Sequence, residues 1–400
     1  MRMTILAASI LPALALASCN SPATGDSTPT ATPSARDIAM TAPAEPVKLQ
    51  STSPFNAVSH GAFDEPWALA FEPGTGVIFI TEKPGTMKFF DPGSGRLGTV
   101  TGMPAVAYEG QGGLGALAFA PDYDANGLIY LSWAKQDGAD TRAVVGRGTL
   151  VCEEADTCRV DNLTQIWSQS RTGERRGHYS HRIAFSPDGR YLFVSSGDRQ
   201  EQTPAQDLSN NLGTIVRLNL DGTPAAGNPF ADRGSPADQI WTYGQRNMLG
   251  LEFDPSGNLW ALEHGPAGGD ELNLVQRGSN YGWPARSNGK NYDGTPIPDH
   301  APDDGFTRPA ISWTPVIAPG GMAFYDGTMF ADWQGQLLIA NLRTQSISRV
   351  TVNAAANSAD EAARYEMPGR LRDIAVAPDG AIWVIEDGEQ GRLLRLTPKN

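Results

Sequence analysis

The 400-residue chain has no surplus of positive charge, because 31 Lys and Arg stand against 44 Asp and Glu, for a formal net charge of −13. Proteins that bind nucleic acid neutralise phosphates with a basic stripe or patch. The sequence has no such stripe, so we expect no nucleic-acid partner. The acidic balance alone identifies no other partner, since it also serves solubility.

Long hydrophobic runs are also missing, apart from one near the N-terminus. Arg2 is followed by an apolar stretch at 5–17, which is too short to span a bilayer comfortably. It leads into Leu16-Ala17-Ser18-Cys19, which resembles a bacterial lipoprotein signal that is cut before the cysteine and lipidated on its thiol. The alternative is an ordinary secretory signal in which Cys19 is incidental.

We therefore predict a lipoprotein-type signal peptide at 1–18 and lipidation of Cys19, and Asn20 favours the outer membrane. Residues 19–50 are rich in Ser, Thr, Pro and Ala without a hydrophobic period, as in a flexible tether. The folded domain is then expected at 51–400, on the periplasmic side of a bacterial membrane.

Cysteine is scarce, with three residues in the chain. An exported protein lies where disulfides persist, and the spacing of Cys152 and Cys158 fits a bridge across a hairpin tip. A metal site is the alternative, but no histidine lies nearby and the pair stands alone. We predict a structural disulfide.

Glycine and proline, in contrast, are abundant, with 44 and 30 residues, as expected for a turn-rich β protein. A short sequence motif recurs along the chain. It consists of a hydrophobic strand, a Pro-Asp-Gly-type turn and a second hydrophobic strand. Its six copies begin at Leu69, Leu117, Ile183, Leu251, Met322 and Ile374. Such a unit is typical of radial repetition. We predict an all-β fold, a six-bladed β-propeller with four-stranded antiparallel blades.

Four loops are more polar in composition than the segments predicted to form the blades, and three of them directly precede a copy of the repeat. They contain His178, Arg246 with Asn247, the segment 263–284, and Arg370 with Arg372. Equivalent positions in successive blades lie on the same face of a propeller. The polar residues should therefore converge at one mouth of the channel.

The residue types in these loops suggest chemistry. His178 can accept a proton near neutral pH, and Asp198 at the end of the next strand pair can orient it. The three arginines favour a polyanionic ligand, because guanidinium groups pair with carboxylates. The turn Gly265-Pro266 and the adjacent Asp270 and Glu271 offer oxygens of the kind that Ca²⁺ binds. Each residue alone also has a structural interpretation, and only their joint placement favours a site.

Seven segments, in the same order, resemble the soluble quinoprotein sugar dehydrogenases of the glucose/sorbosone dehydrogenase family, and their aldose sugar dehydrogenase branch most. They are Gly-Gln-Gly-Gly-Leu (110–114), His178 before Arg-Ile-Ala-Phe, Gly197-Asp198, Arg246-Asn247, Glu-His-Gly-Pro to Asp-Glu-Leu-Asn (263–273), Asn-Tyr-Gly-Trp-Pro (280–284) and Arg-Leu-Arg-Asp (370–373). The resemblance covers about 55–398 and implies a six-bladed propeller that binds pyrroloquinoline quinone (PQQ) and Ca²⁺.

By position, the resemblance implies roles for single residues. His178 would be the catalytic base, Asp198 would orient it, and Arg246 with Asn247 would contact the quinone oxygens and stabilise developing negative charge. A Ca²⁺ beside PQQ would polarise the quinone. The other implied contacts are Gln111, Arg370 and Arg372 with PQQ, the carbonyls of Gly265 and Pro266 with this Ca²⁺, and Asp270, Glu271 and Tyr281 with a second, structural Ca²⁺.

Some positions depart from the family pattern. Arg343 stands where the family has a Lys on PQQ, which keeps the charge but changes the geometry. Ser180-His181 replaces Gly-Gly, and His264 stands where Gln is common. Long inserts that shape the glucose pocket of the soluble glucose enzyme are absent, which favours a more open site.

The leading interpretation is an exported PQQ-dependent aldose dehydrogenase. It would oxidise an aldose sugar at C1 to the lactone and pass electrons to an external acceptor, a quinone or a cytochrome. One alternative is a Ca²⁺-dependent propeller lactonase or hydrolase, which needs a metal held by side-chain ligands at the channel centre. The other is a lipid-anchored propeller that binds carbohydrate or protein without activity.

Overall fold

A computed structural model describes residues 40–171 and 173–399. The predicted signal peptide and the predicted lipidation site Cys19 lie outside the described residues. The described part holds 28 β-strands, one short α-helix and five 3₁₀ helices, which confirms the all-β prediction. None of its helices is long and apolar enough to cross a membrane.

Three of the sheets are four-stranded antiparallel meanders. The first has the strands β12 (Ser180–Phe185), β13 (Tyr191–Ser196), β14 (Thr214–Asn219) and β15 (Ile240–Tyr243). The second has β16 (Met248–Phe253), β17 (Leu259–Glu263), β19 (Asp270–Leu274) and β21 (Ile311–Trp313). The third has β22 (Pro319–Phe324), β23 (Leu337–Asn341), β24 (Ser346–Asn353) and β25 (Ser358–Glu366).

A nine-stranded sheet contains two further meanders, which are joined where β11 pairs with β7 in parallel. One meander has β4 (Pro66–Phe71), β5 (Ile78–Glu82), β6 (Thr86–Asp91) and β7 (Arg96–Thr101). The other has β8 (Leu114–Phe119), β9 (Leu128–Asp137), β10 (Asp140–Val151) and β11 (Thr157–Ser168). Between β10 and β11, Cys152 and Cys158 form a disulfide, as predicted.

The fifth large sheet joins the two ends of the domain, because β3 (Phe55–Phe63) pairs with β28 (Gly391–Pro398) in antiparallel register. Its other strands are β26 (Leu371–Val376), β27 (Ile382–Glu386) and β2 (Glu45–Val47). The small remaining elements are β1 (Met40–Thr41), β18 (Ala267–Gly268), β20 (Gly289–Lys290), α1 (Tyr123–Asn126), η1 (Thr203–Gln206), η2 (Ala231–Arg233), η3 (Ala237–Gln239), η4 (Ala331–Trp333) and η5 (Ala354–Ala356).

The last part of the predicted tether needs a correction, because β1 and β2 lie within 19–50. β1 pairs with β7, next to the stretch of β7 that pairs with β11, and β2 pairs with β3 at the edge of its sheet. An edge strand offers unpaired backbone groups, and an extended segment with a proline such as Pro46 can pair there. Residues 40–47 therefore belong to the folded domain.

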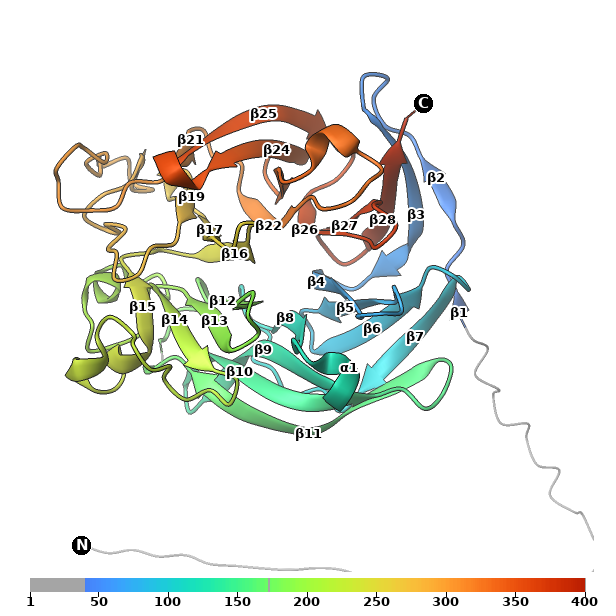
Figure 1. Ribbon diagram of the computed structural model, residues 1–400, viewed down its shortest axis with the longest axis horizontal. Coiled ribbons are helices and arrows are strands. Elements are labelled where there is room, and N and C mark those ends of the chain that lie inside the picture. The colour runs from blue at the N-terminus through green and yellow to red at the C-terminus, as the bar shows by residue number, and fades with distance from the viewer. Residues whose placement is uncertain (1–39, 172, 400) are drawn as a thin grey trace, which may run out of the picture. The chain divides into compact units, whose positions relative to one another are not determined.

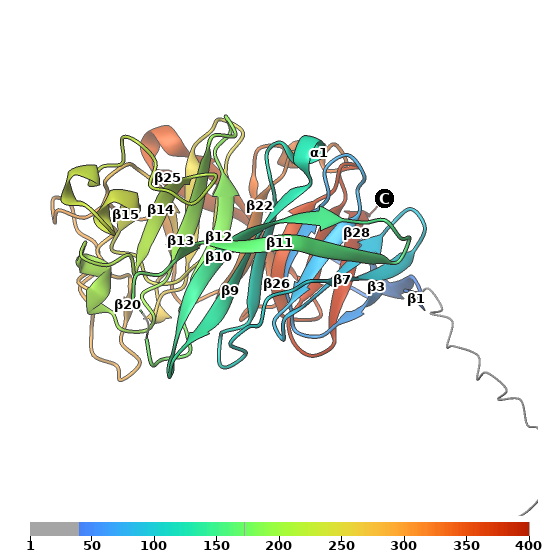
Figure 2. The same ribbon diagram turned by 90° about the horizontal axis from the view of Figure 1, so that it is seen from below.

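The repeat copies begin in the strands β4, β8, β12, β16, β22 and β26, and each of these strands contacts the next, with β26 closing on β4. The six strands surround a common centre (Figure 1). In the view turned by 90°, the strands run from one face of this ring toward the other (Figure 2). The loops that precede them therefore meet at one face.

Each neighbouring pair of meanders shares an apolar cluster, so the core is a ring of interfaces rather than one centre. The cluster at the closing seam packs Trp383 of β27 against Leu69, Ile80 and Phe90 from β4, β5 and β6. Trp383 is 1% exposed, and its ring lies 6.0 Å from that of Phe90.

We expect Trp383→Ala to lower the free energy of unfolding by about 3–5 kcal/mol, because it leaves a cavity at the seam that closes the ring. Trp383→Phe, which keeps an aromatic ring, should lose clearly less. Denaturant or thermal unfolding of the purified variants measures both. A loss below about 1 kcal/mol for Trp383→Ala, within the range of surface substitutions, would contradict this role for the seam.

Candidate functional site

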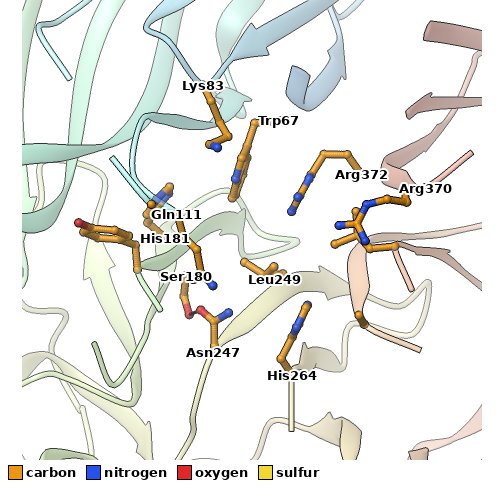
Figure 3. Close-up of a pocket in the computed structure, with 14 residues that line it drawn as sticks. Trp67, Lys83, Gln111, Ser180, His181, Asn247, Leu249, His264, Arg370 and Arg372 are labelled. Atoms are coloured by element: carbon orange, nitrogen blue, oxygen red, sulfur yellow. Dashed lines mark hydrogen bonds between the residues drawn. The ribbon is translucent and has the colours of Figure 1, made fainter. Parts of the chain in front are cut away.

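A cavity of about 320 Å³ lies at the face where the ring-strand loops meet (Figure 3). Its lining comes from residues just before or at the start of the ring strands and from residues just after the second strands of the meanders. They are Trp67, Lys83, Gly110, Gln111, Tyr179, Ser180, His181, Asn247, Leu249, His264, Ala318, Leu342, Arg370 and Arg372. A second cavity of about 710 Å³ shares His264, Ala318 and Arg370 with the first, and Arg343 and the 265–268 loop also line it.

Beside this cavity, His178 and Asp198 form a buried pair. Nδ1 of His178 lies 2.6 Å from Oδ1 of Asp198, and the backbone N–H of His178 donates to Oε1 of Gln111 at 2.8 Å. The indole N–H of Trp283 donates to the other carboxylate oxygen at 2.7 Å. Nε2 of His178 has no hydrogen-bond partner within the described ranges.

The electrostatics of this pair favour a neutral imidazole beside an ionised carboxylate. Burial lowers the pKa of His178, and this outweighs the opposing effect of Asp198. Burial alone would raise the pKa of Asp198, but His178, Arg246 and Trp283 outweigh it and keep that pKa below its ordinary value. His178 is therefore ready to accept a proton.

The loop that carries His178 has an unusual backbone. His178, Ser180 and His181 have φ values of 48°, 57° and 55°, in the left-handed region that non-glycine residues rarely adopt. Side-chain contacts hold this geometry, since the Ser180 hydroxyl donates to Oδ1 of Asn247 at 3.1 Å and accepts from the N–H of Met248 at 2.8 Å. The loop is thus tied to β16.

Arg246 is buried next to this pair. Its backbone N–H donates to Glu263 at 2.6 Å and its guanidinium donates to the carbonyl of His264 at 3.1 Å. Its Nε has no hydrogen-bond partner in the described part of the chain. The hydroxyl of Tyr292, a residue that is 78% exposed, lies 3.3 Å from the guanidinium.

Arg370 and Arg372 are not free cations, because both donate to Asp387. The nitrogens of Arg372 lie 2.9 and 2.7 Å from Oδ1, and Nε of Arg370 lies 3.0 Å from Oδ2. Two positive charges face one carboxylate, so the cavity wall keeps a net positive charge. Arg343 adds to it from another loop, whereas Lys83 is paired with Glu65 at 3.3 Å.

Three of the five residues that the sequence assigned to Ca²⁺, Gly265, Glu271 and Tyr281, line one small cavity together with Glu263. Asp270 accepts from the N–H groups of Gly265 at 2.9 Å and Ala318 at 2.7 Å, next to the 265–266 turn. Glu271 lies opposite Glu263, and Asn273 donates to both carboxylates at 3.5 and 2.9 Å. The Tyr281 hydroxyl donates to the carbonyl of Leu274.

Burial raises the pKa of Asp270 to about 6 and of Glu263 to about 7, and it raises that of Glu271 well above its ordinary value. Two carboxyls that face each other in a buried site repel when ionised. Oδ1 of Asn273 is buried beside them without a hydrogen-bond partner in the described residues. A cation between the two carboxylates would remove their repulsion.

Sequence reasoning missed several residues of the site. Trp67 and Lys83 line the cavity, Trp283 holds Asp198, and Tyr292 covers Arg246. Trp283 stands inside the Asn-Tyr-Gly-Trp-Pro segment, which marks it as a candidate. The other three have no signal in the residue pattern, since their positions depend on contacts between distant segments.

Comparisons with known proteins agree on one family. The family model described as Glucose / Sorbosone dehydrogenase matches residues 63–395. The chain is 35% identical over 341 residues to aldose sugar dehydrogenase YliI of Escherichia coli, covering 84% of this chain and 91% of that protein. It is 26% identical to quinoprotein glucose dehydrogenase B of Acinetobacter calcoaceticus, covering 88% and 89%.

Solved structures give the same result. The apo-form of the soluble aldose sugar dehydrogenase from Escherichia coli superposes with a TM-score of 0.80 at 34% identity, covering 86% of this chain and all, 100%, of that one. The PQQ-bound form of aldose sugar dehydrogenase from Streptomyces coelicolor has a TM-score of 0.69 at 27% identity, covering 90% and 100%. The family resemblance seen in the sequence is confirmed, and the chain belongs to the glucose/sorbosone dehydrogenase family.

Proposed function

We propose that the protein is a PQQ-dependent dehydrogenase that oxidises aldose sugars at C1 to the lactone and passes the electrons to an external acceptor, a quinone or a cytochrome. The observation that carries this proposal is the neutral, strained His178, hydrogen-bonded to an ionised Asp198 beside a cavity with a positively charged wall. Membership of the family and the PQQ-bound relative support it.

In this proposal His178 is the general base. Nε2 takes the proton of the C1 hydroxyl, while Asp198 keeps Nδ1 protonated and stabilises the imidazolium that forms. Trp283 fixes the carboxylate, so the base cannot turn away from the sugar. PQQ, when bound, supplies the acceptor for the hydride that leaves C1.

The cavity residues fit a planar tricarboxylate such as PQQ. Arg372 and Arg370 offer positive charge, and Gln111 and Asn247 offer amide groups. Arg343, from the adjoining cavity, extends the positive wall. The guanidinium of Arg246 keeps one donor, Nε, without a partner among the described residues, and this donor is suited to a quinone oxygen.

Calcium fits two places. The carbonyls of Gly265 and Pro266 would hold one Ca²⁺ beside the cofactor, with Asp270 fixing the turn behind them. A second Ca²⁺ would lie between Glu263 and Glu271, in the small cavity that Tyr281 also lines. The ion at the first place would act as a Lewis acid.

We further propose a six-bladed propeller of four-stranded blades, in which the nine-stranded sheet counts as two blades and the β3–β28 sheet as the sixth. The six contacting ring strands support this count. Lipidation of Cys19 and a place on the periplasmic side of a bacterial outer membrane complete the proposal. Both rest on the N-terminal sequence alone.

The two alternatives differ in what the mouth of the channel must hold. A Ca²⁺-dependent lactonase needs side-chain ligands for a metal at the centre of the channel, whereas Arg370 and Arg372 line the cavity there. A binding propeller without activity needs no cofactor. Binding of PQQ therefore separates it from a dehydrogenase.

Reconstitution is the first test of the proposal. We expect the metal-stripped full-length protein to oxidise aldoses with an artificial electron acceptor only when both PQQ and Ca²⁺ are added. Lactone formation and acceptor reduction measure the activity. Absence of PQQ binding under these conditions would reject the dehydrogenase and favour the binding propeller.

His178→Ala should lower kcat by about 10²–10⁴-fold, the range of a lost general base, while the Kd for PQQ stays within about threefold. Steady-state kinetics and a PQQ titration measure the two effects. His300→Ala is the matched control, because His300 lines neither cavity and should leave kcat unchanged. Near-normal turnover of His178→Ala would remove it as the base.

The pH dependence of kcat/KM should show an acid limb below pH 6.5, because burial lowers the pKa of His178 from its ordinary 6.5. The base acts when unprotonated, so activity is present above its pKa and is lost as the pH falls through it. Asp198→Asn removes the group that favours the imidazolium, so its acid limb should lie lower still, with kcat reduced at least 10²-fold. An acid limb that moves upward in Asp198→Asn would contradict the assigned pair.

A further inference from the structure

His181 lines the 320 Å³ cavity, whereas the proposed base His178 does not. His181 is 2% exposed, and its φ of 55° lies in the left-handed region. His178 is not among the residues that line this cavity, whereas Gln111, Arg370 and Arg372 are. The cavity that His181 lines therefore belongs to the anionic cofactor rather than to the sugar.

The surrounding chain leaves room for this ring. A Cβ atom on Gly115 would lie 2.0 Å from Cε1 of His181 and 2.3 Å from Nδ1, so only glycine fits at position 115. Gly115 is in β8, the ring strand next to β12. The glycine in one strand thus accommodates the imidazole of its neighbour.

Ser132 contacts one ring nitrogen of His181. Nδ1 lies 2.8 Å from Oγ of Ser132, and this oxygen also accepts the N–H of Ala116 at 2.8 Å. When the Ser132 hydroxyl donates to Nδ1, the ring proton lies on Nε2. Burial and the neighbouring Arg182 lower the pKa of His181 to about 3, so the ring is neutral.

Trp67 holds the ring flat. The two rings are stacked, with centroids 5.2 Å apart and planes inclined by 22°. The guanidinium of Arg182 lies 4.2 Å from the same indole and forms a salt bridge of 3.0 Å with Asp373 of β26. Arg182 thus links Trp67 in β4 to β12 and, through Asp373, to β26.

We propose that His181 is a cofactor-binding residue, which with Trp67 forms a rigid floor and donates one hydrogen bond from Nε2 to an acceptor atom of the planar anionic cofactor. Nε2 has no hydrogen-bond partner in the described part of the chain, and His181 and Trp67 both line the cavity. This inference rests on the proposed function, because it assumes that PQQ occupies the cavity. It gives His181 a contact that does not involve proton transfer from the sugar.

The test is a PQQ titration of the purified full-length protein in the presence of Ca²⁺, followed by quenching of tryptophan fluorescence. His181→Phe keeps a flat ring on Trp67 but removes the donor, and we expect its Kd to rise about tenfold. His181→Gly removes the ring as well as the backbone strain, and its Kd should rise at least as much. His60→Phe is the matched control, since His60 lies against Trp383, 5.1 Å away, outside the cavity, and its Kd should not change.

The outcomes separate this inference from the proposed function. If the unmodified protein does not bind PQQ, the proposed function fails. If it binds PQQ and His181→Phe binds equally well, the donor role is overturned while the function stands. If His181→Gly binds more tightly than the unmodified protein, the ring only obstructs the cavity, and the inference is also overturned. Thermal unfolding of each variant shows that the compared proteins are folded.

Discussion

The pairing of β3 with β28 is the contact on which the site depends. It joins residues 55–63 to residues 391–398 and lets β26 lie beside β4, so that the ring of first strands closes. The mouth is lined from Trp67 in the first meander to Arg372 in the last. Such a mouth exists only when the ring is closed, because each neighbouring pair of meanders supplies part of its wall. The β3–β28 pairing that closes the ring is therefore also what allows the cavity to form.

Within that mouth, the balance between burial and charge sets the chemistry. His178 and His181 belong to one loop, and burial lowers the pKa of both. Their partners differ, since Asp198 offers His178 a carboxylate that favours the protonated ring, whereas Ser132 offers His181 only a hydroxyl. Two histidines three positions apart thus differ in their environment, because only His178 has a carboxylate that favours its protonated form.

The repeat made the ring strands and the converging loops predictable, because strand–turn–strand patterns are local. The position of His178 before β12 and of Arg372 at the start of β26 follows directly from it. The sequence does not reveal which side chains become partners. Trp283 reaches Asp198 across 85 residues, and Asp387 occupies arginine donors that the sequence pattern leaves open for a ligand. The first contact joins neighbouring sheets and the second lies within one sheet, and the repeat pattern specifies neither.

The loop 178–181 has a backbone geometry that lowers the stability of the fold. Each non-glycine residue in the left-handed region costs about 1–2 kcal/mol, and 178–181 contains three. A glycine at 180 or 181 would avoid this cost. However, Ser180 ties the loop to β16 and His181 fills the space beside Gly115, so glycine at either position would release a contact at the cavity wall. The hydrogen bonds and stacking that hold the strain also fix where His178 stands, and a base that must meet one hydroxyl benefits from a loop that cannot relax.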